Sequence, residues 1–251
     1  MIGWWRRRSR DGQHRLPLLG LMRVGTNVTR TVLEAHYAVQ VAYNHLGWKH
    51  GLVPTFAPGC GWAYPPEAPL VVVKHPVAQL HSLYVYQRRV GRNLQAAGPD
   101  LAAFLRGRIV VRADELAAAP EYRFANPVQL WNGGVWNHLR YAQARGGLVL
   151  RYEDLLADPA AACARVAAHF RLAPRPDAPA TLTLPGRAVR RMDDRPGRRR
   201  ERYLTEEAFD KAAFFLEERY LADFAAEDLA FIERELDPDL VAELGYAGPA
   251  R

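Results

Sequence analysis

The stretch that decides the fold reads Leu16-Pro17-Leu18-Leu19-Gly20-Leu21-Met22-Arg23-Val24-Gly25-Thr26-Asn27-Val28-Thr29-Arg30-Thr31-Val32-Leu33-Glu34. Its first part is a short apolar run, which is typical of a buried parallel strand. From Val28 onward the apolar side chains recur with helical spacing. Between the two lies a short polar turn with a single glycine, Gly25. The stretch therefore predicts a strand, a tight turn and a helix.

The turn is a candidate anion site. The first N–H groups of a helix have no partner within the helix, and the helix dipole is positive at that end. Gly25 allows the backbone to approach a ligand closely, Arg23 adds a positive charge, and Thr26 and Asn27 add hydrogen-bond donors. The same residues also fit an ordinary strand–helix turn in which Thr26 caps the helix. This stretch alone leaves both interpretations open.

A second candidate anion site follows the clearest strand, an apolar run over residues 70–74. The run is rich in β-branched side chains and predicts a strand buried on both faces, with a helix after it over residues 77–89. Lys74 lies at the strand end, and Ser82 follows eight residues later on the helix. Both side chains can point toward the carboxyl edge of a parallel sheet. The alternative for Ser82 is a plain hydroxyl on a helix surface.

The rest of the chain alternates between strand and helix patterns. We expect a short strand over residues 43–51 that ends in Lys49-His50, an irregular loop over 53–69, a helix over 128–144, a strand over 148–152 and a helix over 160–169. The apolar run at residues 109–111 has no assigned place. These patterns predict a three-layer α/β domain with a central parallel sheet flanked by helices. Helical periodicity over residues 205–246 adds a helical C-terminal region.

Length and charge limit the class of protein. A chain of 251 residues with 49% hydrophobic residues fits one globular domain over residues 1–251 and argues against disorder. The net charge of +7 suggests an anionic ligand or partner, with arginines concentrated in a basic tail (1–15) and an arginine-rich loop (181–202). The tail is expected to be solvated, and peripheral contact with a membrane is the alternative. Cys60 and Cys163 form neither a metal spacing nor a disulfide framework, so we expect a cytoplasmic protein.

The two candidate anion sites resemble, in order and spacing, those of sulfotransferases that use 3′-phosphoadenylyl sulfate (PAPS). The segment 23–27 is similar to the family's 5′-phosphosulfate loop, which usually has lysine where this chain has Arg23 and a hydroxyl where it has Asn27. Lys74, Pro76 and Ser82 are similar to the 3′-phosphate element, in which arginine is usual at the first position and binds phosphate in a bidentate manner. The resemblance implies PAPS as co-substrate, no metal, and nucleotide contacts from Arg23, Val24, Gly25, Thr26, Asn27, Lys74, Ser82 and, in the arginine-rich loop, Arg198, Arg199 and Arg200.

Two further segments are typical of the same family. They are residues 148–159, with Tyr152, Glu153 and Asp154 after a predicted strand, and the ending Leu244-Gly245-Tyr246. We expect Tyr152, Glu153 and Asp154 to fix the strand–helix connection rather than to catalyse. The resemblance extends over residues 16–246 and implies the P-loop-like sulfotransferase fold.

Sulfuryl transfer needs an in-line nucleophile, a base for the acceptor proton, and positive charge where the leaving phosphate gains negative charge. Arg23 and the helix N–H groups serve the leaving side. His50 is the favoured base because an ordinary histidine titrates near neutral pH. Lys49-His50 also resembles the Lys-x-His strand end of cytosolic sulfotransferases, one residue shorter. Glu34 is the alternative base, since several carbohydrate and tyrosyl-protein sulfotransferases carry an acidic residue near that point.

Each candidate base also has a plain structural interpretation. His50 fits a loop histidine that is hydrogen-bonded to the backbone, and Glu34 fits a solvated carboxylate on a helix.

The sequence thus favours an enzyme that moves a sulfuryl group from PAPS to a hydroxyl acceptor. A carbohydrate or glycolipid is the first expectation and a small alcohol or phenol the second, because aromatic residues in the loop around Trp62 suit stacking on a ring. A catalytically inactive nucleotide-binding module is the main alternative, motivated by Asn27 and Lys74. A basic nucleic-acid-binding protein is less favoured, since aromatic side chains do not alternate with the arginines. A nucleotide kinase lacks the hydroxyl that holds magnesium after a loop lysine.

Overall fold

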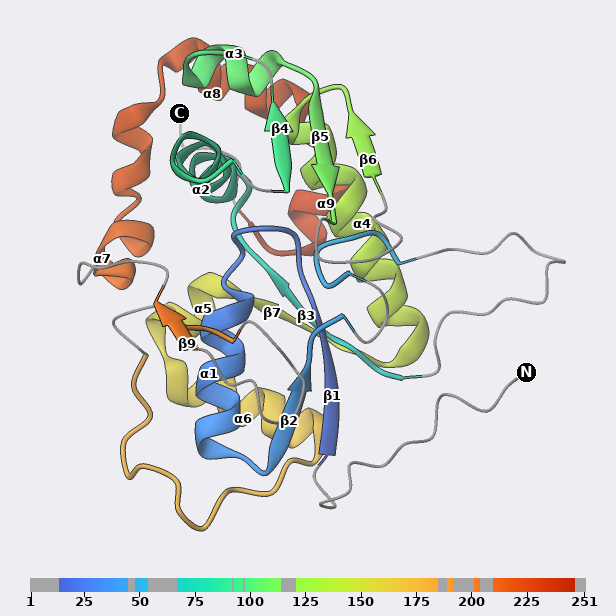
Figure 1. Cartoon of the computed structure of the whole chain (residues 1–251), viewed down its shortest axis with the longest axis vertical. Coiled ribbons are helices and arrows are strands. Elements are labelled where there is room, and N and C mark those ends of the chain that lie inside the picture. Colours follow the sequence, from blue (N-terminus) through green and yellow to red (C-terminus); the bar gives the residue numbers. More distant parts are fainter. Residues whose placement is uncertain are drawn as a thin grey trace, which may run out of the picture.

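A computed structural model describes residues 14–44, 48–53, 67–91, 93–96, 98–113, 121–184 and 210–246, together with the backbone of residues 189–191 and 201–203. Its centre is a four-stranded parallel sheet with the strand order β2-β1-β3-β7. The strands are β1 (His14–Leu19), β2 (Val39–Ala42), β3 (Leu70–Val73) and β7 (Leu148–Arg151). The predicted α/β class, with a central parallel sheet flanked by helices and a helical C-terminal region, is confirmed (Figure 1).

Strand β3 holds the sheet together because it is apolar on both faces and every one of its residues is buried. It pairs with β1 at Leu18↔Leu70 and with β7 at Leu70↔Leu148. The carboxyl ends of the strands point toward the start of α2 (Pro76–Arg89) (Figure 1). Ligands of open parallel sheets bind at this edge, so the candidate residues that follow β1 and β3 lie where a site is expected.

The long helices begin and end close to the predicted positions. They are α1 (Thr26–His36), α2, α4 (Pro127–Arg145) and α6 (Pro159–Phe170). Asn126 caps α4 by accepting a hydrogen bond from the Gln129 N–H, and Asp158 caps α6 in the same way through the Ala161 N–H. In both helices a proline follows the cap, where its missing N–H costs nothing. Short helix α5 (Tyr152–Ala157) joins β7 to α6.

A second sheet, which the sequence did not reveal, takes up the unassigned run at residues 109–111. It is antiparallel, with the order β4-β5-β6, and contains β4 (Leu94–Ala96), β5 (Ile109–Arg112) and β6 (Glu121–Phe124). Helix α3 (Leu101–Arg106) connects β4 to β5. Strand β6 carries charged side chains and none of its residues is fully buried, so it lacks the apolar pattern that marks a strand. Figure 1 shows this sheet above the parallel one.

The C-terminal region is helical, as predicted, but it is divided into short pieces. These are α7 (Lys211–Leu216), the 3-10 helix η1 (Arg219–Asp223), α8 (Ala226–Glu235) and α9 (Pro238–Glu243). Polar side chains of α4 hold the joint between α8 and α9: Asn132 donates to the Glu235 carbonyl at 2.8 Å and accepts from the Asp237 N–H at 3.1 Å. In the described residues no helix is both long and apolar enough to cross a membrane.

One predicted strand is wrong. The second strand does not cover residues 43–51 but is β2, and residues 49–51 form a turn. The reason is the burial alternation of Val39, Gln40 and Val41, of which only Gln40 is exposed. Lys49 and His50 therefore lie in a turn rather than at a strand end.

The arginine-rich loop also holds a strand pair, because β8 (Val189–Arg191) pairs antiparallel with β9 (Glu201–Tyr203). Arg198, Arg199 and Arg200, residues 1–13 of the basic tail and most of the aromatic loop lie outside the described residues.

Candidate functional site

The turn after β1 is shaped by two residues in the left-handed region. Arg23 has φ 71° and Gly25, the N-cap of α1, has φ 95°. A Cβ at Gly25 would lie 2.3 Å from Cδ2 of Tyr152, so only glycine fits there. Thr26 is the first helical residue rather than the cap, so the interpretation as a threonine-capped turn is wrong. The N-cap residue thus offers no side chain to the first N–H groups of α1.

Arg23 stands beside this turn; the residue is exposed as a whole, but its guanidinium lies next to an aromatic ring. Its Cζ lies 5.3 Å from the ring centroid of Tyr86 on α2. Loss of water around the side chain lowers the pKa of Arg23, while Tyr86 and Tyr152 act in the opposite direction. An arginine remains charged under these conditions, since its ordinary pKa is far above neutral. The turn therefore combines a helix N-terminus with a full positive charge.

Lys74 and Ser82 are brought together, as their spacing predicted. Lys74 Nζ donates to Ser82 Oγ at 2.8 Å, and Ser82 Oγ donates to the Ala78 carbonyl at 2.9 Å. Lys74 is only 1% exposed, and its Nζ lies 3.3 Å from the ring centroid of Phe215 on α7. Burial holds the pKa of Lys74 well below its usual range, and Arg23 lowers it further, against the opposing effect of Glu153. The Phe215 ring therefore covers one side of this ammonium group.

The two candidate anion sites both adjoin the Tyr152 ring. The ring lies against Gly25, and its centroid is 5.4 Å from Lys74 Nζ. Tyr152 is the residue that follows β7, so it reaches the same sheet edge as the ends of β1 and β3. Its phenol is buried, which raises the pKa of Tyr152 far above its ordinary value and keeps it neutral. Both candidate anion sites therefore adjoin the same buried ring.

Glu153 and Asp154 make connections around the same strand end. Glu153 Oε1 accepts from the His75 N–H at 2.9 Å, and Glu153 Oε2 accepts from the Tyr246 hydroxyl at 3.0 Å. Asp154 pairs with Arg165 at 2.9 Å. Glu153 thus ties the end of β7 both to the start of α2 and to the C-terminal end of the described chain.

Asn27, the second residue of α1, meets Lys49 from the turn after β2. Lys49 Nζ donates to Asn27 Oδ1 at 3.0 Å, and the single proton of the Tyr43 hydroxyl is shared between the Thr26 carbonyl at 3.0 Å and the same Oδ1 at 3.1 Å. Lys49 Nζ also lies 3.5 Å from the centroid of the Tyr43 ring. Two donors on Oδ1 orient the amide, so Nδ2 is the face of Asn27 that can donate to a ligand. Sequence reasoning missed Tyr43, which precedes the predicted polar pair without any motif.

His50 is held at the end of β1. Its Nδ1 lies 2.6 Å from the Gly20 carbonyl, and the Gly20 N–H donates to the Lys49 carbonyl at 3.1 Å. Because a carbonyl can only accept, Nδ1 carries the proton and the lone pair of the neutral ring is on Nε2. Nε2 is then the atom that can take a proton from a substrate.

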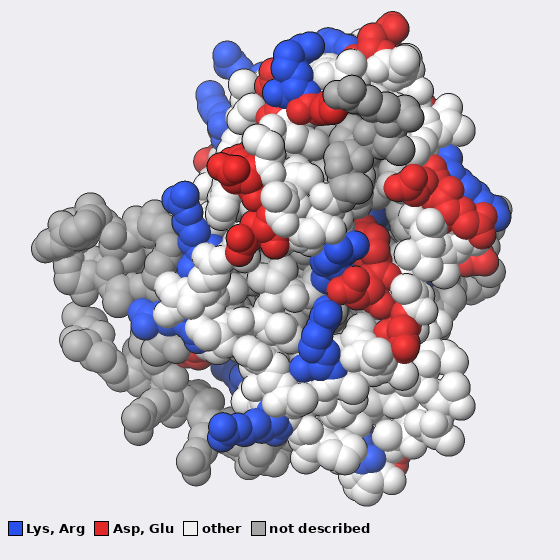
Figure 2. Space-filling model, turned by 180° about the vertical axis from the view of Figure 1, so that it is seen from behind, with Lys and Arg blue, Asp and Glu red and all other residues white. Residues whose placement is uncertain are grey.

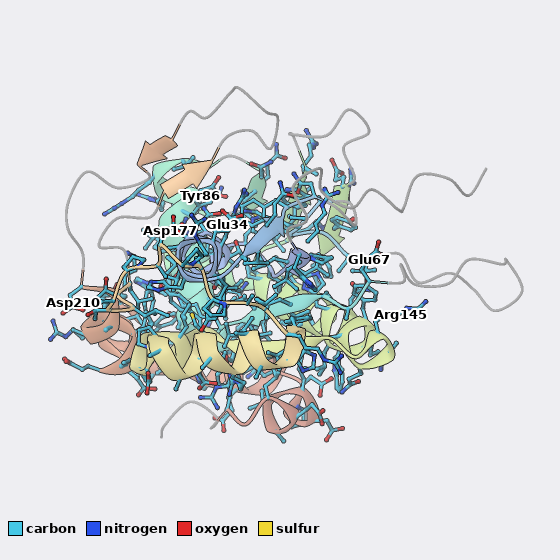
Figure 3. The ribbon with its side chains drawn as sticks, turned by 90° about the horizontal axis from the view of Figure 1, so that it is seen from below. Glu34, Glu67, Tyr86, Arg145, Asp177 and Asp210 are labelled. Atoms are coloured by element: carbon cyan, nitrogen blue, oxygen red, sulfur yellow. The ribbon has the colours of Figure 1, made fainter. Side chains whose placement is uncertain are left out.

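Glu34, the alternative base, is not brought to the turn. Its Oε1 accepts from Arg30 Nε at 3.1 Å and from the Val41 N–H at 3.0 Å, so it ties α1 to β2. It is the ninth residue of α1, which places it ~12 Å along the axis from Thr26. Figure 3, which looks along α1, shows Glu34 beside that helix. These contacts give Glu34 a structural role between α1 and β2, and its role as the alternative base stays a prediction.

The surface offers a further constraint. Figure 2 shows acidic and basic side chains interspersed among uncharged ones, so the described residues on this face form no continuous basic surface. Within the described ranges, no group of three or more His, Cys, Asp or Glu side chains could hold a metal ion.

Comparisons with known proteins find no matching family model, no similar curated protein and no similar solved structure.

Proposed function

We propose that this chain is a PAPS-dependent sulfotransferase with the P-loop-like sulfotransferase fold. The observation that carries the proposal is the arrangement around Tyr152, whose ring adjoins both the helix N-terminus at Gly25 and Lys74 with Ser82. PAPS bears phosphate-type groups at both its 5′ and 3′ positions. The arrangement suits a ligand whose anionic groups are separated by a sugar, because each end then has its own positive partner.

The turn serves the leaving side of the reaction. Negative charge grows on the 5′-phosphate as the sulfur–oxygen bond breaks, and the N–H groups of α1 with Arg23 can stabilise it without rearrangement. Asn27 can donate from Nδ2 in place of the usual hydroxyl. Lys49, which contacts Asn27, adds a second positive charge beside this helix end.

His50 serves the acceptor side. The acceptor oxygen attacks sulfur, the bond between sulfur and the phosphate oxygen breaks, and the acceptor proton passes to His50 Nε2. The hydrogen bond from Nδ1 to the Gly20 carbonyl fixes the tautomer that leaves Nε2 basic. A hydroxyl of a carbohydrate or glycolipid is the acceptor we favour, followed by a small alcohol or phenol.

The test is binding of adenosine 3′,5′-bisphosphate, measured by calorimetry and by thermal shift. We expect Arg23→Ala and Lys74→Met each to abolish binding, whereas Arg108→Ala, at an exposed arginine of the loop between α3 and β5, leaves it unchanged. Transfer of labelled sulfate from PAPS to a panel of sugars, glycolipids and phenols then tests the reaction. A folded protein that shows no heat and no shift with the bisphosphate overturns the proposal.

One observation favours a second candidate, an inactive nucleotide-binding module. Lys74 is covered by Phe215 and donates a hydrogen bond to Ser82 within the fold, which suits a structural lysine as well as a ligand-binding one. This candidate predicts that the bisphosphate binds through the turn, that Lys74→Met leaves binding unchanged, and that no acceptor in the panel is sulfated.

A further inference from the structure

The turn that carries Lys49 and His50 is held from two directions. On one side it is bonded to Gly20 at the end of β1, through the Lys49 carbonyl and His50 Nδ1. On the other side, residues 51–53 lie against α4, in the part of that helix that contains Asn137 and His138. A catalytic group on a turn needs such support, because side chains on irregular segments are otherwise placed less accurately than those on helices and strands.

Asn137 holds Val53 with both ends of its amide group. The Val53 N–H donates to Asn137 Oδ1 at 2.7 Å, and Asn137 Nδ2 donates to the Val53 carbonyl at 2.9 Å. The side chain thus satisfies both backbone groups of one residue, as a neighbouring strand would do. Val53 itself is 2% exposed, so these groups have no access to water and depend on Asn137.

His138 holds the next contact toward His50. Its Nε2 lies 2.7 Å from the Gly51 carbonyl, so Nε2 carries the proton. Burial lowers the pKa of His138 to about 4, which keeps the ring neutral and the hydrogen bond intact at neutral pH. Tyr122 on β6 closes the remaining side: its hydroxyl is hydrogen-bonded to the Leu52 backbone and lies 3.0 Å from where a Cβ of Gly51 would be.

We propose that Asn137 and His138, with Tyr122, are positioning residues that fix the turn of residues 48–53 and so aim His50 at the end of β1. The role of His50 as a base rests on the proposed function, but its placement by α4 does not. Three side chains, two from α4 and one from β6, contact the three consecutive residues 51–53 that follow His50. Loss of one of these side chains displaces His50, while the Gly25 turn, which lies between β1 and α1, stays in place.

The experiment compares Asn137→Ala with Asn132→Ala. Asn132 is a matched control because it lies on the same helix and also makes two amide bonds to backbone, but at the α8–α9 joint. Tyr122→Phe is a milder second variant that keeps the ring and removes only the hydroxyl. The readout on the full chain is the titration of the His50 imidazole by NMR, assigned with His50→Ala. We expect Asn137→Ala and Tyr122→Phe to shift or broaden the His50 signal, and Asn132→Ala to leave it unchanged.

Kinetics give the second readout. Because a displacement of ~1 Å can cost ~10²-fold in rate, we expect Asn137→Ala to lower kcat by ~10-fold or more with an unchanged affinity for adenosine 3′,5′-bisphosphate. The same substitution in a His50→Ala background should cost nothing further, since a positioning residue acts only through the group it positions.

The outcomes separate the two proposals. A His50 titration that is the same in wild type, Asn137→Ala and Tyr122→Phe overturns the positioning role, whatever the activity. Equal additional loss in the His50→Ala background also overturns it. A displaced His50 in a protein that does not bind the bisphosphate supports the positioning role and counts against the proposed function alone.

Discussion

The two candidate anion sites beside Tyr152 offer different kinds of partner to an anion. The turn at Gly25 offers backbone N–H groups whose direction is set within a few residues, by a left-handed glycine and the start of α1. Lys74 offers one side-chain ammonium that is buried beneath Phe215, a residue from the far end of the chain. The first partner is local and needs no rearrangement, whereas the second depends on how distant elements pack. We call the turn at Gly25 the fixed half of the candidate site and Lys74 with Ser82 the covered half. Substitutions in the two halves should have different effects.

The largest effect is expected at the fixed half, from Gly25→Ala. The substitution forces a side chain into a left-handed conformation and drives its Cβ against Tyr152 at 2.3 Å. We expect the free energy of unfolding to fall by about 3 kcal/mol, from conformational cost and overpacking together. Denaturant unfolding measures the loss, and bisphosphate binding should disappear with it.

Gly146→Ala is the matched control for this prediction. Gly146 also has a positive φ, 64°, but a Cβ there meets nothing within 4 Å. It should cost only ~1 kcal/mol and leave binding intact. If both substitutions lowered the free energy of unfolding equally, the contact with Tyr152 would contribute nothing to the effect of Gly25→Ala.

The turn of residues 48–53, which carries Lys49 and His50 and is separate from both halves, has its own signature in pH. The folded-state pKa of His138 is about 4 and its ordinary value is 6.5, so the unfolded chain binds a proton that the folded chain excludes. Stability is therefore lost as pH falls from 6.5 toward 4, by about 3 kcal/mol from this group. Denaturant unfolding at several pH values, compared with His138→Gln, isolates the contribution from the carboxylates. The variant should show a flatter dependence over that range, and identical slopes would contradict the assigned burial.

The covered half should respond in the opposite direction. Lys74 has a lowered pKa because burial disfavours its charge, so replacing it by an apolar side chain of similar size removes a cost. We expect Lys74→Met to be as stable as wild type or more stable, and to have lost bisphosphate binding. Between the lowered folded pKa and 10.5, wild-type stability should rise with pH, because the unfolded chain holds the proton longer. Lys74→Met should lack this rise, and a clear loss of stability at neutral pH would show that the ammonium is needed by the fold.

The fixed half was largely predictable from the sequence, and the reason is local chemistry. A strand run, a lone glycine and a helical run within residues 16–34 specify the turn. Likewise, the spacing of Lys74 and Ser82 across one strand–helix joint brings them together. The parallel sheet followed from apolar β-branched runs such as β3. Tyr152 could have been placed by the same logic, since it follows a parallel strand that ends at the same edge.

Other features depend on contacts between distant segments and could not be predicted. Phe215 reaches Lys74 through the packing of α7, for which residues near 215 carry no local signal. Glu34 is close to the turn in sequence, but it lies two helical turns away from it, and its Oε1 accepts a hydrogen bond from the Val41 N–H. Strands β4 and β6 are too short or too polar to show a period. The hydrogen bonds of Asn137 and His138 join α4 to residues 51–53, which lie far away in the chain.

The smallest effect on stability, and the sharpest test of the difference between the halves, is expected from Phe215→Ala. Helix α7 has no fully buried residue, and Phe215 is half-buried, so truncation should lower the free energy of unfolding by only about 1 kcal/mol. If α7 must move before a phosphate reaches Lys74, only a fraction of molecules is competent to bind, and removing the ring raises that fraction. Stopped-flow measurements should then show faster association of adenosine 3′,5′-bisphosphate than in wild type. Leu216→Ala, at the neighbouring residue whose side chain is 42% exposed, should leave the rate unchanged. An association rate unaltered by Phe215→Ala would mean that the bisphosphate binds without uncovering Lys74, and the covered half would then belong to the fold rather than to the site.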